Sequence, residues 1–168
     1  MKQQLIFIAI FLFRISYSVL AQDYSSLKDI ELKEKSDFAK AEDKVLECSK
    51  YLLSTPMDDS GKNRVYCTQF ILEWMVGTPD YNFTIDEIIT KIAEPNKLLL
   101  GVCLASMAKY VLENKDNAKD TKEIKYNSIL MLINYAQESK NNVVIKGELK
   151  KLIKEKEKGK LKEYLKLD

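Results

Sequence analysis

The sequence predicts an all-α fold, a single helical bundle of five or six helices. Glycine and proline are scarce, with five and three among 168 residues, and lysine, glutamate, leucine and isoleucine are abundant, a composition that favours helix. Apolar residues recur at steps of three and four, the spacing of one helix face, and no long stretch alternates with the two-residue period of a strand. The bundle is either orthogonal or built from two related helical hairpins that stack.

Residues 1–21 have the layout of a secretory signal peptide. Lys2 gives a positive start, residues 5–13 form an uncharged apolar run, and the small residue Ala21 stands at the expected cleavage site. The apolar run is shorter than the roughly 20 residues that a membrane-spanning helix needs. We therefore expect an exported protein, periplasmic or extracellular, cleaved after Ala21 or Ser18. A retained membrane anchor is the alternative.

The charge balance argues against nucleic acid as a partner. The chain has 27 Lys and Arg against 25 Asp and Glu, and loss of the signal segment removes Lys2 and Arg14 but no acid. The remaining chain then has 25 basic and 25 acidic residues, whereas nucleic-acid-binding proteins carry a clear basic excess. About 147 residues remain after that loss, enough for one domain with a substantial core.

The first firm helix follows a mainly polar segment, residues 22–35, which is expected to form a loose arm or a marginal helix. Ser36 or Asp37 is expected to cap that first helix, which ends before Pro56. Its buried face is formed by Phe38, Ala41, Val45, Cys48 and Leu52. After a turn-rich connection, a second helix is expected over 62–76. Its buried side is formed by Cys67, Phe70, Ile71, Trp74 and Met75.

The next loop, residues 77–87, reads GTPDYNFTIDE and combines glycine, proline, aromatic and turn-forming residues. Gly77 is expected to end the second helix in a left-handed conformation. Thr84 and Glu87 have the spacing of a capping box for the following helix, with Phe83 at the staple position before it. Ordinary helix ends thus explain most of the loop. The weak candidates that remain for binding a ligand or a partner are Trp74, Asp80 and Tyr81.

Three further helices complete the predicted core domain, 36–145. A short helix is expected over 85–93, a central helix that is apolar almost all round over 96–114, and a nearly as buried helix over 121–139. Small residues of the central helix would let a neighbouring helix approach closely; these are Gly101, Ala105 and Ser106. The similar sequences KYLL and KYVL end the first and the central helix. They suggest two related hairpins, 36–76 and 96–139.

The cysteines, Cys48, Cys67 and Cys103, leave at least one thiol unpaired within the chain. In an antiparallel hairpin of the first two helices, Cys48 and Cys67 are nearly equidistant from the turn and lie on the buried faces. We hypothesise a disulfide between these two. The alternative is two buried free thiols, and Cys103 is expected to be an inert core residue. The chain has no histidine, which excludes imidazole-based sites.

The lysine-rich segment 146–168 is expected to form a C-terminal helix with a kink or break near Gly159. It carries nine lysines and five acids, and its leucines recur at helical spacing. Either the segment packs these leucines onto the bundle, or it lies as a basic amphipathic helix on an anionic membrane or an acidic partner.

These patterns favour a non-catalytic function. We expect an interaction or accessory protein of the cell envelope that binds a protein partner in a groove between hairpins lined by aromatic residues. The rivals are a structural protein on a membrane surface, held by segment 146–168, and an enzyme that uses carboxylates. No catalytic, cofactor-binding or metal-binding residue is predicted.

Overall fold

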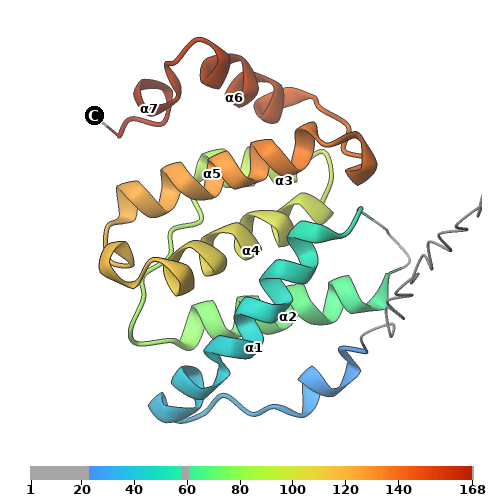
Figure 1. The fold of residues 1–168 in the computed structure, drawn as a ribbon, viewed down its shortest axis with the longest axis vertical. Helices are drawn as coiled ribbons and strands as arrows, with labels where there is room; N and C mark the ends of the chain where they lie inside the picture. Colours follow the sequence, from blue (N-terminus) through green and yellow to red (C-terminus); the bar gives the residue numbers. More distant parts are fainter. Residues whose placement is uncertain (1–22, 58–60, 168) are drawn as a thin grey trace, which may run out of the picture.

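A computed structural model describes residues 23–57 and 61–167, which contain seven α-helices and no strand. The helices are α1 (Lys35–Ser54), α2 (Lys62–Gly77), α3 (Glu87–Ala93), α4 (Leu98–Glu113), α5 (Thr121–Gln137), α6 (Gly147–Glu157) and α7 (Leu161–Tyr164). Three short 3-10 helices join them: η1 (Ser25–Asp29), η2 (Lys115–Asn117) and η3 (Ser139–Asn141). The helices pack against one another as a bundle (Figure 1), so the predicted all-α class is confirmed.

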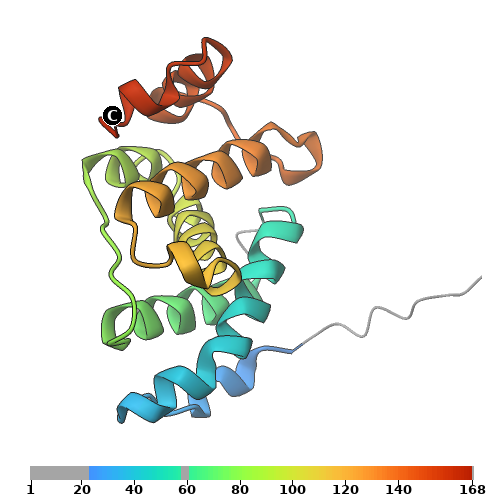
Figure 2. The ribbon, with the colours of Figure 1, turned by 60° about the vertical axis from the view of Figure 1, so that its left-hand side comes forward.

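Helix α4 forms the centre of the bundle, as its apolar sequence predicts. Its residues are buried on almost every side, and it contacts α1, α2, α3 and α5 (Figures 1 and 2). Helices α2 and α4 approach closely at Gly101, where an added Cβ would lie 2.5 Å from Oγ1 of Thr68. The predicted close approach is therefore confirmed at Gly101.

Both expected hairpins are present, since α1 packs against α2 and α4 against α5. Across the first hairpin, Nε1 of Trp74 donates a hydrogen bond to the carbonyl oxygen of Phe38 at 3.0 Å. Gly77 is the last residue of α2 and is not left-handed, so the predicted glycine cap is wrong. A Cβ at Gly77 would lie 2.3 Å from Cζ of Phe38. Packing against this ring, and not a turn, requires the glycine.

Within the polar segment that precedes α1, residues 25–29 form the short 3-10 helix η1, which agrees with the marginal helix that was one of the two predictions. Helix η1 contacts α2. Leu27 of η1 and Tyr24, which precedes it, are buried. Neither Ser36 nor Asp37 is the N-cap of α1, which begins slightly earlier than predicted. The carboxylate of Asp37 instead lies in the first turn and accepts a hydrogen bond from the backbone amide of Glu34 at 2.9 Å.

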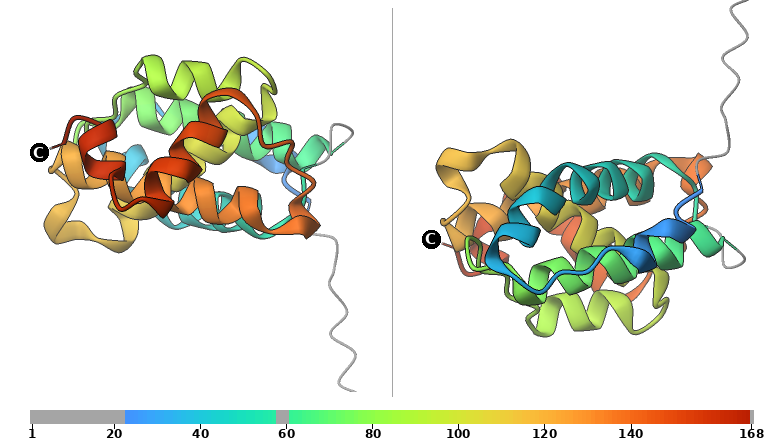
Figure 3. Two further views of the ribbon diagram at one scale, coloured as in Figure 1. Left: turned by 90° about the horizontal axis from the view of Figure 1, so that it is seen from above. Right: turned by 90° about the horizontal axis from the view of Figure 1, so that it is seen from below.

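The lysine-rich segment forms two helices, α6 and α7, which lie over one end of the bundle (Figures 1 to 3). The predicted break is at Gly159, whose φ of 71° is in the left-handed region that favours glycine. The apolar side of the segment is buried, and α6 contacts α3 and α5. The buried residues are Leu149, Leu152, Ile153, Leu161 and Leu165. Of the two predicted arrangements, the structure has the one in which the leucines pack on the bundle.

The predicted signal segment, 1–21, lies outside the described residues, and its role stays a prediction. A search of the described helices for one with the length and hydropathy to span a bilayer found none.

Candidate functional site

The loop between α2 and α3 has side chains in two different environments. Residues 81–86 contain no turn or helix. Within this stretch Tyr81 is buried and Phe83 packs against the core, whereas Asn82 and Thr84 are exposed. Side chains of an extended segment point alternately to opposite sides. The loop therefore presents one face to the core and the other to the outside.

The inward face of the loop joins an aromatic cluster that consists of Trp74, Tyr81 and Phe83. The ring centroids of Tyr81 and Phe83 lie 5.5 and 5.8 Å from that of Trp74. Trp74 is fully buried and Tyr81 is 8% exposed, so both are core residues in this structure, and their contact with a ligand or partner stays a prediction. Aromatic character alone did not distinguish a core residue from a surface one. The third candidate, Asp80, is exposed, and its Oδ1 lies 3.5 Å from Nζ of Lys35.

The Tyr81 hydroxyl connects three parts of the chain. It donates a hydrogen bond to Oε1 of Glu42 in α1 at 2.8 Å and accepts one from Nζ of Lys115 in η2. Lys115 also pairs with Oε2 of Glu42 at 2.6 Å. Burial raises the pKa of the Tyr81 hydroxyl and outweighs the opposing effect of Lys115, while Glu42 raises it further. These contacts give Tyr81 a structural role.

The start of α3 differs from the prediction in a way that matters for the site. The N-cap is Asp86 and not Thr84, so the predicted capping box with Glu87 is wrong. Oδ1 of Asp86 accepts hydrogen bonds from the backbone amides of Ile88 at 3.0 Å and Ile89 at 3.2 Å. Aspartate caps helices at least as well as threonine does. Because the helix starts two residues later than the capping box requires, the Thr84 side chain is available for another role.

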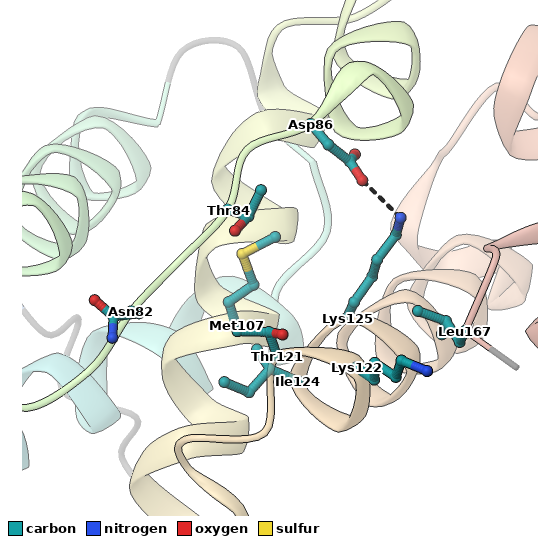
Figure 4. A pocket seen from close by; sticks show the side chains of 9 residues that line it. All are labelled: Asn82, Thr84, Asp86, Met107, Thr121, Lys122, Ile124, Lys125 and Leu167. Carbon is teal, nitrogen blue, oxygen red and sulfur yellow. Dashed lines mark ion pairs between the residues drawn. The ribbon is translucent and has the colours of Figure 1, made fainter.

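The outward face of the loop lines a cavity of about 180 Å³, which we call the loop cavity (Figure 4). The loop contributes Asn82, Thr84 and Asp86, α4 contributes Met107, the first two turns of α5 contribute Thr121, Lys122, Ile124 and Lys125, and the C-terminal segment contributes Leu167. The methionine and the isoleucine are buried apolar residues. Most of the other lining residues bring amide, hydroxyl, ammonium or carboxylate groups. The cavity thus combines a small apolar surface with several polar groups.

The charged residues that line the loop cavity are two lysines and one aspartate. Oδ2 of Asp86 lies 2.7 Å from Nζ of Lys125, and the same ammonium donates to the carbonyl oxygen of Leu165 at 3.3 Å. Burial opposes ionisation of Asp86. Hydrogen bonds from Lys125 and the α3 amides outweigh that effect, and they lower the pKa of the carboxyl group. Lys122 also lines the cavity, so its lining residues include two lysines and one carboxylate.

The groups around the loop cavity are suited to binding an anion. Hydroxyl, amide and ammonium groups all donate hydrogen bonds. A general acid and base, by contrast, require two titratable groups placed on either side of a reacting atom. Asp86 is the single carboxylate among the lining residues. Among the described residues, no three His, Cys, Asp or Glu side chains are grouped so that they could hold a metal ion.

Most residues of the loop cavity were not recognised from the sequence. Thr84 was assigned to a helix cap, and Thr121 and Lys125 were assigned to no site. The carboxylate of Asp120 caps α5 by accepting hydrogen bonds from the amides of Lys122 and Glu123 at 2.9 and 3.1 Å. Such local signals predict where α5 begins. They do not reveal that this beginning lies opposite the loop.

Comparisons of the chain with protein-family models, with curated proteins and with solved structures each found no match. A functional proposal therefore rests on the geometry of the chain itself. The features that it must explain are the buried aromatic cluster, the positively charged loop cavity and the exposed lysines of α6.

Proposed function

We propose that the protein is an exported, non-catalytic binding protein that acts as an accessory or interaction protein of the cell envelope. Its loop cavity takes a carboxylate group from a protein partner, either an acidic side chain or a chain end. The observation that carries the proposal is the excess of cationic and hydrogen-bond-donating side chains around the cavity.

The chemistry of the loop cavity favours a carboxylate over other groups. The Asp86 carboxylate already accepts from Lys125 and from two backbone amides, so it is compensated within the protein. Lys122 lies in the first turn of α5, where the helix dipole adds partial positive charge. A carboxylate that enters the cavity meets these donors together with the hydroxyls of Thr84 and Thr121.

The size of the loop cavity agrees with a single functional group as the ligand. Its volume of about 180 Å³ is more than one water molecule needs and less than the roughly 300–1,000 Å³ of pockets for drug-sized ligands. A carboxyethyl group, the end of a glutamate side chain, occupies that space, whereas a nucleotide or a folded peptide does not. Supporting contacts with a partner then come from the surface around the cavity.

A second candidate function is supported by the exposed face of α6. Lysines recur there at intervals of four residues, which places them on one side of the helix: Lys146, Lys150, Lys154 and Lys158. They give the protein a basic surface that an anionic membrane would attract. Because the leucines of α6 and α7 are buried in the bundle, such binding would be electrostatic and without insertion. A carboxylate-based enzyme has the weakest support, since Asp86 is compensated by Lys125.

Binding of an acidic peptide tests the proposal. Fluorescein-labelled hexaglutamate is titrated with the protein in low-salt buffer and followed by fluorescence anisotropy, and labelled hexalysine serves as the charge control. We expect hexaglutamate to bind and hexalysine not to bind. The variants Lys125→Met and Asn82→Ala both alter the loop cavity. Lys125→Met should weaken binding about tenfold or more, because a hydrogen bond to a charged group is lost.

The matched control is Lys154→Ala, which removes a lysine from the exposed face of α6. It should leave hexaglutamate binding nearly unchanged if the ligand occupies the loop cavity. Weakening by Lys154→Ala but not by Lys125→Met would reject the loop cavity and favour the basic surface of α6. Circular dichroism melting curves of all three variants separate a loss of binding from a loss of folding.

A further inference from the structure

The register of the α1–α2 hairpin brings two cysteines together. Nη1 of Arg64 in α2 donates to the carbonyl oxygen of Leu52 in α1 at 3.3 Å. Cys48 lies four residues before Leu52, and Cys67 lies three residues after Arg64. In an antiparallel pair, one turn away from the Arg64–Leu52 contact leads to Cys48 on α1 and to Cys67 on α2. The two thiols therefore lie at the same level of the hairpin.

Both thiols of this pair lie inside the core. In this structure Cys48 and Cys67 are free thiols, and both are fully buried between α1 and α2. The neighbouring Cys48 and burial raise the pKa of the Cys67 thiol, so it stays protonated in the folded, reduced protein. A protonated, buried thiol is a poor nucleophile. Once the bundle has formed, the pair is thus shielded from thiol reagents.

Tyr24, the residue before η1, packs against α1 and α2 near this pair. Tyr24 is 3% exposed, its backbone amide donates to Oδ1 of Asn63 at 3.2 Å, and its ring centroid lies 4.9 Å from that of Tyr51. Burial raises the pKa of the Tyr24 hydroxyl, and the nearby Cys67 and Cys48 raise it further. Tyr24 therefore helps to close the core beside both cysteines.

We propose that Cys48 and Cys67 form an intramolecular disulfide that staples α1 to α2. The bond forms before η1 docks, while the thiols are accessible, by exchange with the disulfide of a thiol oxidoreductase in an oxidising compartment. One cysteine thiolate attacks a sulfur of that disulfide to give a mixed disulfide and one oxidant thiolate. The second cysteine thiolate then displaces the other oxidant sulfur. The Cys48–Cys67 bond is formed, the oxidant is reduced to two thiols, and the protons of the cysteines pass to these thiols.

Cys103 remains outside this reaction. It lies on α4, is 1% exposed, and burial raises the pKa of its thiol to about 12.

The Cys48–Cys67 disulfide closes a loop of about 20 residues. Chain-entropy arguments for such a loop give roughly a hundredfold shift of the unfolding equilibrium toward the folded state. The inference is independent of what the loop cavity binds.

Thiol counting on the full-length chain tests the inference. The chain is produced with its signal segment in a host that secretes it into an oxidising compartment, purified, and alkylated under denaturing conditions for intact-mass measurement. We expect one alkylated cysteine without reductant and three after reduction, with peptide mapping that places the bond between Cys48 and Cys67. Three alkylated cysteines without reductant, or a bond that includes Cys103, would overturn the proposal.

Two variants and one kinetic measurement sharpen this result. Cys103→Ala should keep the bond, whereas Cys67→Ala should show two free thiols without reductant. In the folded protein dithiothreitol should leave the bond intact, and added denaturant should make it reducible, because both sulfurs are buried. Rapid reduction without denaturant would contradict the shielding by Tyr24. Hexaglutamate binding, measured in parallel, reports on the loop cavity alone, so failure of the binding proposal is distinguishable from failure of this one.

Discussion

Replacement of Tyr81 by phenylalanine removes one hydroxyl where α1, the loop and η2 meet. The ring keeps its packing on Trp74, so the change isolates the hydrogen bonds to Glu42 and Lys115. Hydrogen bonds to charged groups contribute about 1.5–3 kcal/mol each. Glu42 and Lys115 remain paired with each other at 2.6 Å, and their side chains are 26% and 52% exposed, so water partly replaces the lost hydroxyl. We therefore expect the free energy of unfolding to fall by about 1–2 kcal/mol.

The assay is thermal and urea denaturation followed by circular dichroism. The matched control is Tyr126→Phe, because the Tyr126 ring lies under Nζ of Lys162 at 4.8 Å and its hydroxyl has no hydrogen bond among the described residues. The control should change stability by less than about 0.5 kcal/mol. An equal effect of the two substitutions would refute the structural role of the Tyr81 hydroxyl. Loss of hexaglutamate binding by Tyr81→Phe at unchanged stability would place Tyr81 back in the binding site.

Gly77→Ala should lower the free energy of unfolding by about 1–3 kcal/mol in thermal denaturation, because the added Cβ would overlap the ring of Phe38. The adjacent Val76→Ala, at a residue that is 80% exposed, should have an effect below about 0.5 kcal/mol, and equal effects would contradict the packing argument. Asp86→Asn keeps a helix cap but removes the charge that pairs with Lys125. The folded-state pKa of Asp86 is lowered relative to about 3.9 in the unfolded chain, so its charge stabilises the fold above about pH 4 and that contribution is lost as the pH falls through the folded-state value. In urea denaturation the wild type should have a free energy of unfolding about 1 kcal/mol higher than that of Asp86→Asn at pH 7, and this difference should shrink below pH 4. A difference that stays constant down to pH 2 would show that the charge pair with Lys125 does not cause the stabilisation.

The helical class was predictable because helix periodicity is a local property of the sequence. The stretch that forms α4 is apolar on every side, and such a helix has no face that water can cover. Its central place in the bundle followed directly. Gly101 was also interpreted correctly, because small residues within a buried helix have few roles other than a close helix contact.

Helix ends and single side chains were predicted less well, for physical reasons. Thr84 and Asp86 are both good caps, and the sequence does not tell which one begins α3. Gly77 fits a left-handed cap by its position, whereas its actual cause is the ring of Phe38, 39 residues away in the chain. Contacts between residues distant in the sequence decided both cases.

The loop cavity was invisible from the sequence for a similar reason. Its lysines belong to α5 and its hydroxyl and amide groups belong mainly to the loop, and only the packing of α3 and α5 around α4 brings them together. The alternation of apolar and polar residues from Tyr81 to Asp86 was the one available signal. Six residues are too few to separate that pattern from an ordinary turn-rich loop.

The most direct test of the proposed binding site is an NMR titration of the ¹⁵N-labelled protein with N-acetylglutamate, a single carboxylate-bearing side chain. Occupation of the loop cavity predicts saturable amide shifts that concentrate at residues 82–86 and 121–125 and that Lys125→Met reduces. Shifts that instead follow the exposed lysines of α6, or no saturable shifts at all, would contradict the assignment of the loop cavity as the binding site.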